Sequence, residues 1–215
     1  MSISEMVEDL FKDEHLTEKQ KRIIEAAVLI FSTKGFFDSS TKEIAINAGV
    51  AEGTIFRYYR TKKDLLQSIM EKTISKLTTI HGNGMNETER FDNRYKNLKD
   101  FISTFIKERY DMVKKYSPLV KILLHELTLR KEIWEPYFLV NLRSLNEDFK
   151  NLFGKLGQKD DRIKNGSETA LRLIITTMVG FFVFKFLLDQ EINGRDEDEI
   201  EMIVNYIVDG LVVRA

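Results

Sequence analysis

The sequence predicts an all-α protein with two parts, an N-terminal three-helix domain that contains a helix-turn-helix and a larger C-terminal helical domain. Three observations support this fold class. Apolar residues recur at helical spacing along most of the 215 residues, prolines occur only at positions 118 and 136, and helix-capping patterns precede several apolar stretches. Cysteine is absent, which is typical of a cytoplasmic protein without a disulfide framework.

The first two predicted helices each follow a capping-box pattern. A Ser-x-x-Glu pattern at residues 2–5 precedes five apolar residues at helical spacing within residues 3–11. We therefore expect residues 1–16 to form an amphipathic extension. Such a helix either docks on the body of the protein or frays, or it contacts a partner or a membrane surface. A Thr-x-x-Gln pattern at residues 17–20 starts the second helix, which Gly35 ends.

Residues 40–63 are the most informative stretch of the chain. Ser40 and Glu43 form a capping pattern for a short helix, which stops at Gly49, a residue that tolerates a positive φ. A second short helix follows and places Ile55 where it can pack against the first. Two helices joined by a tight turn with glycine are typical of the unit that reads the major groove of DNA.

The polar residues of this stretch suit contacts to DNA. Arg57 projects away from buried Ile55, so we expect it to read a base edge, with Lys42 as a second candidate. The alternatives are an ordinary helical hairpin with a solvated basic face, and an adaptor that has lost DNA binding. The residues expected to hold phosphates are Ser40, Thr41, Thr54, Tyr58, Lys62 and Lys63.

Residues 17–70 resemble the DNA-binding domain of TetR-family transcriptional regulators. The family pattern is matched by Phe-x-x-x-Gly at 31–35, Ile-Ala-x-x-Ala-Gly-Val at 44–50, Gly-Thr-x-aromatic-x-aromatic-aromatic at 53–59, and Lys62 with Leu65. The resemblance implies phosphate contacts at Phe56, Tyr58 and Lys62. Phe56 departs from the usual tyrosine and has no hydroxyl to donate.

The distribution of charge agrees with a DNA-binding segment. The whole chain has a formal net charge of −1, which argues against nonspecific coating of nucleic acid. Residues 17–72 hold ten basic and seven acidic side chains, whereas residues 1–16 hold one and five. The positive charge is therefore local, as a specific DNA contact requires.

The remainder of the chain predicts a second helical domain. We expect domain boundaries at residues 1–16, 17–72 and 73–215, with a break at the His-Gly-Asn-Gly sequence of 81–84. Helices are expected from residue 98 to 115, from Pro118 to Arg130, across 131–153, from Ser167 and from Asp196.

The last two predicted helices are more apolar than a peripheral pair in a small domain would be. Their apolar stripes would be a liability unless they were covered. The family resemblance implies a four-helix bundle with a second copy, and hence a homodimer, and the alternative is a core within one chain. The most apolar run, residues 173–184, is shorter than the roughly 20 residues that span a bilayer, so we expect no membrane partner and a cytoplasmic location.

The family resemblance also implies an effector cavity among the middle helices. An apolar lining would suit a small hydrophobic or amphipathic molecule, although each aromatic residue taken singly also fits core packing. The candidate residues are Phe101, Phe105, Arg109, His125, Glu126, Trp134, Tyr137, Phe138, Arg143, Phe181 and Phe182.

No catalytic, metal-binding or cofactor motif is expected. His125 and Glu126 begin a zinc-like pattern, but Leu129 stands where the second histidine is needed. The sequence therefore predicts a ligand-responsive, homodimeric DNA-binding regulator rather than an enzyme. A repressor that binds a palindromic operator and is released by its ligand is the family's usual mode.

Overall fold

The computed structural model describes most of the chain. It covers residues 1–78, 95–127, 167–188 and 196–211, together with separate positions between 131 and 155. Those positions are 131, 132, 135, 136, 140, 143, 146, 147, 149–151 and 153–155, and all of them are helical. The expected break at 81–84 lies outside the described residues.

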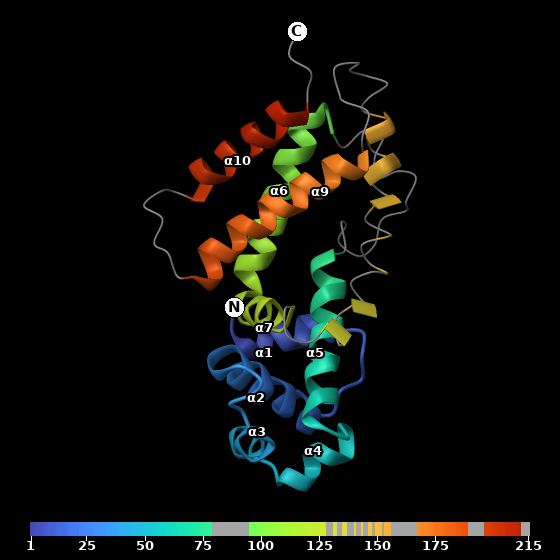
Figure 1. Ribbon diagram of the computed structural model, residues 1–215. Coiled ribbons are helices and arrows are strands. Elements are labelled where there is room, and N and C mark those ends of the chain that lie inside the picture. Colours follow the sequence, from blue (N-terminus) through green and yellow to red (C-terminus); the bar gives the residue numbers. More distant parts are fainter. Residues whose placement is uncertain are drawn as a thin grey trace. The chain divides into compact units, whose positions relative to one another are not determined.

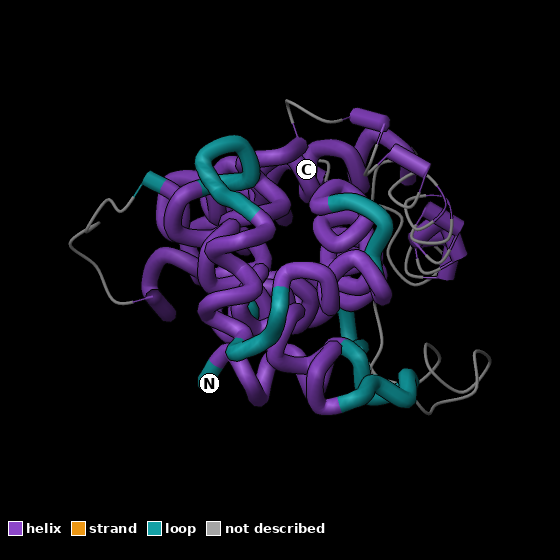
Figure 2. Tube along the Cα trace, turned by 90° about the horizontal axis from the view of Figure 1, so that it is seen from below, coloured by secondary structure: helices purple, strands orange, loops and turns teal. Residues whose placement is uncertain are grey.

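The described residues are helices and connecting loops, as the sequence predicts. Figure 2 shows helix in purple and loop in teal, with no strand drawn in the part of the chain that it describes. The chain divides into two compact units. Unit 1 contains Met1–Leu77 and Lys115–Leu139, and unit 2 contains Thr78–Lys114 and Val140–Ala215. The all-α fold class is confirmed.

Unit 1 is built around the long helix α2. This helix packs against α1, α3 and α7, and α3 packs against α4. Figure 1 shows α1 to α4 following one another in blue and cyan. The helices of this unit are α1 (Ile3–Leu10), α2 (Glu18–Lys34), α3 (Thr41–Ala48), α4 (Glu52–Tyr58), α5 (Lys62–Thr78) and α7 (Ser117–Leu127).

The N-terminal helix α1 is docked within unit 1. Ser2 and Glu5 form the predicted capping box at its start. Met6, Val7 and Phe11 are buried, and α1 packs on α2. Within unit 1, α1 is therefore docked on α2 rather than frayed. Burial of an apolar face of this kind stabilises a helix that is too short to persist alone in water.

Unit 2 contains the main part of α6 (Leu98–Lys115), together with α9 (Ser167–Phe182) and α10 (Asp196–Leu211). These helices begin at the residues that the sequence predicts. The end of α9 continues into η1 (Val183–Leu187), a turn of π-helix that the sequence pattern does not predict. The two helices α9 and α10 pack against each other.

A polar cluster joins η1, α6 and the start of α10. Lys185 Nζ lies 2.6 Å from Glu199 Oε2 and 2.9 Å from Asp196 Oδ1. Lys114 Nζ lies 2.9 Å from Asp196 Oδ2, and the Tyr110 hydroxyl also hydrogen-bonds to Asp196. Hydrogen bonds from Tyr110, Lys185 and Lys114 hold the pKa of Asp196 below its ordinary value. The acidic start of α10 is therefore neutralised by cations of its own unit.

Large apolar side chains are exposed on α9, η1 and α10. Met202 and Tyr206 on α10 are 71% and 73% exposed, and Leu173 on α9 and Phe184 on η1 are each 55% exposed. The segment Glu168–Phe186 is, by length and composition alone, apolar enough to cross a membrane, with a mean hydropathy of 1.6. Core and interface helices of soluble proteins have the same composition, so this measure does not assign a location.

Candidate nucleic-acid interface

The turn between α3 and α4 depends on one glycine. Gly49 ends α3 with φ 64° and ψ 41°, in the left-handed region that other residues adopt only at a cost. The Val50 N–H donates to the Ala45 carbonyl oxygen at 3.0 Å, which closes the end of the helix. The chain therefore reverses within three residues, and α4 begins at Glu52.

The contact between α3 and α4 is small and apolar. Ala45 and Ile55 are buried, and Ile44 and Ala48 are buried on the same face of α3. The small side chain of Ala45 lets the two helix backbones approach closely. This core fixes which face of α4 points outward, and Arg57 lies on the exposed part of that helix.

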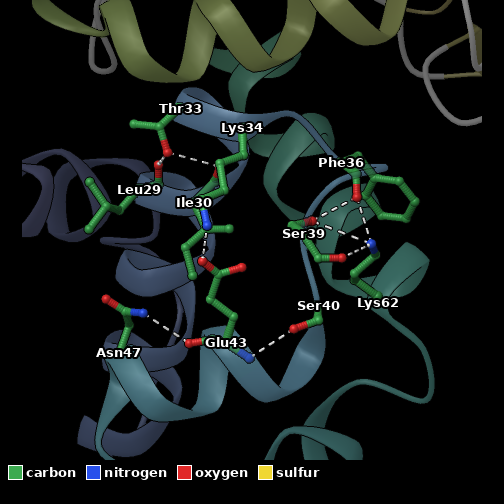
Figure 3. A network of polar contacts seen from close by, with 10 residues as sticks. All are labelled: Leu29, Ile30, Thr33, Lys34, Phe36, Ser39, Ser40, Glu43, Asn47 and Lys62. Atoms are coloured by element: carbon green, nitrogen blue, oxygen red, sulfur yellow. Dashed lines mark hydrogen bonds and ion pairs between the residues drawn. The ribbon is translucent and has the colours of Figure 1, made fainter.

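The N-terminus of α3 is capped in a way that differs in part from the sequence prediction. Ser40 Oγ accepts a hydrogen bond from the Glu43 N–H at 3.1 Å, as expected. The Glu43 carboxylate does not complete a capping box, because it pairs with the Lys34 ammonium at the end of α2 instead (Figure 3). This ion pair ties α3 to α2 and turns the Glu43 carboxylate toward α2.

The residues expected to read bases are accessible. Lys42 on α3 and Arg57 on α4 are both exposed, so each guanidinium or ammonium can reach a groove. Thr41, the first residue of α3, is half-buried and donates its hydroxyl to Glu52 Oε1 at 2.6 Å. Thr54 is half-buried, and its N–H already donates to the Ala51 carbonyl oxygen at 2.8 Å. The Thr54 hydroxyl rather than its amide is thus the group it can offer to a phosphate.

Tyr58 lies beside the N-terminus of α2. The Thr17 hydroxyl, which caps α2, donates to the Tyr58 hydroxyl oxygen at 3.3 Å. The hydroxyls of Thr17 and Tyr58, two residues 41 positions apart in the chain, are therefore in contact. The sequence does not predict this contact, because only the packing of α4 beside α2 brings Thr17 to Tyr58.

The ammonium of Lys62 is held by oxygen atoms of the loop before α3. Lys62 Nζ donates to the carbonyl oxygens of Phe36 and Ser39, each at 2.6 Å, and lies 4.1 Å from the centre of the Phe36 ring. Figure 3 shows these bonds converging on the half-buried ammonium. Lys62 therefore anchors the loop that presents Ser40. A contact of Lys62 to a phosphate remains a prediction.

Lys63 is exposed and forms an ion pair within unit 1. Its Nζ lies 3.2 Å from Glu132 Oε1. Both side chains are well exposed, so the pair adds little stability and its lysine can exchange partners readily. The predicted phosphate contact of Lys63 thus competes with a weak interaction.

The predicted effector residues on α6 lie together in unit 2. Phe101 and Phe105 are buried and stacked, with ring centres 5.8 Å apart. Arg109 is only 8% exposed, and its guanidinium lies 5.6 Å from the centre of the Phe105 ring. Burial lowers the pKa of Arg109 from its ordinary value. The α6 cluster therefore combines apolar aromatic rings with one buried positive charge, that of Arg109.

Sequence reasoning missed several aromatic neighbours of these residues. Phe149 contacts Phe101 with ring centres 5.4 Å apart, and Tyr95 contacts Phe101 at 5.1 Å. Phe181 belongs to a second group, in which it stacks on Tyr110 at 6.0 Å, beside Phe182. Local spacing in the sequence does not pair rings as far apart in the chain as Phe101 and Phe149, or Tyr110 and Phe181.

Three of the other predicted effector residues lie within the described part of the chain. His125 is exposed on α7 and Glu126 is buried on α7, which belongs to unit 1. Arg143 is exposed. Trp134, Tyr137 and Phe138 lie outside the described residues, so their part in effector binding stays a prediction.

The fold and this interface define a helical DNA-binding protein of the helix-turn-helix class. Residues 23–69 match the family described as bacterial regulatory proteins, tetR family. This match spans most of α2, all of α3 and α4, and the first part of α5. Residues 23–69 therefore carry the DNA-binding domain of the TetR family of bacterial regulatory proteins.

Relatives along the chain carry names of the same class. The HTH-type transcriptional regulator YvkB of Bacillus subtilis (strain 168) is 27% identical over 195 residues, which are 89% of this chain and 96% of that protein. The fatty acid metabolism regulator protein of the same organism is 42% identical over 59 residues, which are 25% of this chain and 30% of that protein. The chain is thus similar to transcriptional regulators.

Solved structures share the fold. FadR from Bacillus subtilis in complex with stearoyl-CoA has a TM-score of 0.66 at 21% identity, and the match covers 88% of this chain and 97% of that one. A tetR-family regulatory protein from Rhodococcus RHA1 has a TM-score of 0.70 at 17% identity, over 93% and 100% of the two chains. At these identities the likeness establishes the fold.

Proposed function

We propose that this transcriptional regulator is a homodimeric repressor that binds a palindromic operator and is released by an amphipathic acyl ligand. The observation that carries the DNA-binding role is the recognition helix α4, held against α3 by buried Ile55 with Arg57 on its exposed side. The phosphate groups of DNA would lie along Ser40, Thr41, Thr54, Tyr58 and Lys63. An arginine on a recognition helix pairs well with guanine.

The acyl ligand is suggested by two observations. The cluster of Phe101, Phe105 and Phe149 is apolar and includes the buried guanidinium of Arg109 nearby. An arginine offers five donors in a fork that matches a carboxylate or a phosphate. The solved structure of FadR, which shares the fold, contains stearoyl-CoA. A long apolar tail with an anionic head fits this combination of surfaces.

The homodimer is suggested by the exposed apolar residues of α9, η1 and α10. Leu173, Met202 and Tyr206 lie in solvent in a single chain, and apolar surface of this kind usually marks a protein interface. A second copy that covers these helices would pair two recognition helices. Two paired helices read a palindrome with half-sites one helical turn or a multiple apart. We propose a cytoplasmic location for this dimer.

Selection of bound duplexes from a random DNA pool tests the proposed DNA recognition. We expect enrichment of a palindrome, with an affinity that falls steeply as salt is raised because phosphate contacts release counterions. Failure to enrich any sequence, with protein freed of ligand, would contradict the repressor and favour an adaptor. Enrichment that requires a bound ligand would show that the ligand promotes DNA binding instead.

Addition of stearoyl-CoA to the protein–operator complex tests the proposed ligand class. We expect release of the operator by stearoyl-CoA and no release by coenzyme A alone, because the latter lacks the apolar tail. Stearate serves as a second control for the anionic head. Equal release by all three compounds, or by none, would contradict the acyl-CoA proposal without affecting the selected operator.

A further inference from the structure

Helix α4 begins with an exposed acidic residue, Glu52. Glu52 is exposed, and its Oε1 accepts the Thr41 hydroxyl at 2.6 Å. We propose that Glu52 is a specificity-determining residue that reads the N4 amino group of a cytosine in the major groove. This inference rests on the proposed DNA-binding function.

The position of Glu52 places it among the base-reading residues of a helix-turn-helix. In this motif the N-terminal residues of the recognition helix contact base edges, while the preceding helix crosses the backbone. Glu52 is the first residue of α4, and buried Ile55 fixes how that helix is turned. The carboxylate therefore enters the groove with the start of the helix.

Thr41 holds the Glu52 side chain in one orientation. The two residues are the first residues of α3 and α4, so their hydrogen bond spans the turn. A carboxylate has two oxygens that accept hydrogen bonds, so Oε2 can accept a second donor while Oε1 keeps the Thr41 hydroxyl. A side chain ordered before binding loses less entropy when the complex forms.

The chemistry of a carboxylate selects cytosine among the four bases. A carboxylate accepts hydrogen bonds and donates none, so it is repelled by the O6 and N7 acceptors of guanine and by the O4 acceptor of thymine. Adenine presents its amino group beside the N7 acceptor, an arrangement that suits an amide. Cytosine presents an N4 amino donor to the groove, and glutamate is a known partner for it.

The negative charge of Glu52 sharpens this selection. A carboxylate close to DNA phosphates lowers affinity for any sequence, and only a matching amino donor offsets that loss. Arg57, five residues after Glu52 on α4, supplies attraction for a guanine. Within one half-site, Glu52 would then accept a hydrogen bond from a cytosine amino group, and Arg57 would donate hydrogen bonds to guanine acceptors.

Glu43 provides a matched control on the same motif. Its carboxylate pairs with Lys34 and points toward α2 rather than outward (Figure 3). Both acids lie in the first turn of a helix. A change from glutamate to glutamine therefore removes one charge at each site, while only Glu52 is placed to touch a base.

The experiment begins with selection of the operator by the wild-type protein from a random duplex pool. Dissociation constants are then measured for operators in which each base pair of one half-site is replaced in turn. The proteins compared are the wild type, Glu52→Gln, Glu43→Gln, Thr41→Val and Thr41→Ser. Helical circular dichroism and thermal melting confirm that every variant is folded.

We expect one position at which the wild type prefers cytosine to thymine by about tenfold or more. Glu52→Gln should reduce that preference to within about twofold, because an amide can donate to the thymine O4 as well. Glu43→Gln should keep the wild-type preference. Thr41→Val should weaken the preference in part, because it removes the hydroxyl that orients Glu52, and Thr41→Ser should keep it, because serine retains a hydroxyl. Loss of a phosphate contact at Thr41 would instead change the affinity for all operators alike, because phosphate contacts carry no sequence information.

Two results would overturn the inference while leaving the proposed function intact. The first is a Glu52→Gln protein with the base preferences of the wild type at every position. The second is a uniform change in affinity for all operators, which would show that Glu52 only repels phosphates. A wild-type protein that enriches no operator would instead overturn the proposed function, and this inference with it.

Discussion

The hydroxyl of Tyr116 donates a hydrogen bond to the carboxylate of Asp9, within unit 1. Asp9 lies on α1, and it also accepts Lys115 Nζ at 3.0 Å and Lys76 Nζ at 3.3 Å. The N-terminal helix is therefore joined through one carboxylate to α5, to the last residue of α6 and to the residue that precedes α7. Residues that precede the family match thus take part in holding the DNA-binding unit together.

Replacement of Asp9 by asparagine should lower the free energy of unfolding by about 1–2 kcal/mol. The variant keeps the shape of the side chain but loses the charge that accepts three donors, and exposure of the site limits the loss. Urea denaturation followed by circular dichroism measures the change. Asp13→Asn, at an exposed position of the same segment, should have little effect, and equal loss in both variants would contradict the role of Asp9.

The stabilisation by Asp9 should disappear in acid. Burial opposes ionisation of the Asp9 carboxyl, but the hydrogen bonds from Tyr116, Lys115 and Lys76 outweigh it and lower its pKa from 3.8 to about 2. A lowered folded-state pKa stabilises the protein above the unfolded pKa. The difference in unfolding free energy between wild type and Asp9→Asn should therefore be constant above about pH 5 and shrink between pH 4 and pH 2. A difference that stays constant throughout this range would contradict the pKa shift.

Replacement of Lys62 by methionine should destabilise the protein even without DNA. The variant leaves the Phe36 and Ser39 carbonyl oxygens without the ammonium that they now bind, which should cost about 1–3 kcal/mol. Thermal and urea unfolding of the free protein measure the loss. Lys42→Met removes an exposed lysine of the same surface and should be close to neutral. If both variants unfold alike, Lys62 does not anchor the loop.

Replacement of Arg57 by alanine should weaken operator binding by about 1–3 kcal/mol and relax specificity at one base pair. The guanidinium is exposed on α4 and is not needed for the Ile55 core. Competition binding with single-base operator variants measures both effects. Arg60→Ala, just beyond α4, should lower affinity for all operators alike. Unchanged binding by Arg57→Ala would show that another residue reads the base.

Replacement of Tyr206 by glutamate should separate the proposed dimer. The side chain is exposed on α10 in one chain, and a charge buried in an apolar interface would weaken association by about 2 kcal/mol or more, roughly thirtyfold. Sedimentation velocity across a range of concentrations measures the change. Glu201→Gln, also exposed on α10, should leave the dimer intact. A Tyr206→Glu protein that associates as strongly as the wild type would exclude this face as the interface.

Much of the fold could be predicted because its signals are local. The start and end of α6 and the turn at Gly49 follow from apolar spacing and from glycine within a few residues. The π-turn of η1 could not be predicted, since apolar spacing does not distinguish it from a continuing α-helix. The bonds from Lys62 to Ser39 and from Thr17 to Tyr58 join residues 23 and 41 positions apart. Such contacts depend on packing between helices, which a local pattern does not contain.

The composition of unit 1 from two stretches of chain bears on how this protein can evolve. Helix α7 returns to pack on α2 after the chain has passed through α6, and its Leu119 and Ile122 are buried. A single recombination event near residue 77 would transfer α1–α5 to another protein without α7, which packs on α2. Exchange of the DNA-binding helices α1–α5 between relatives thus requires two crossovers, or a recipient whose own α7 has a surface complementary to α2.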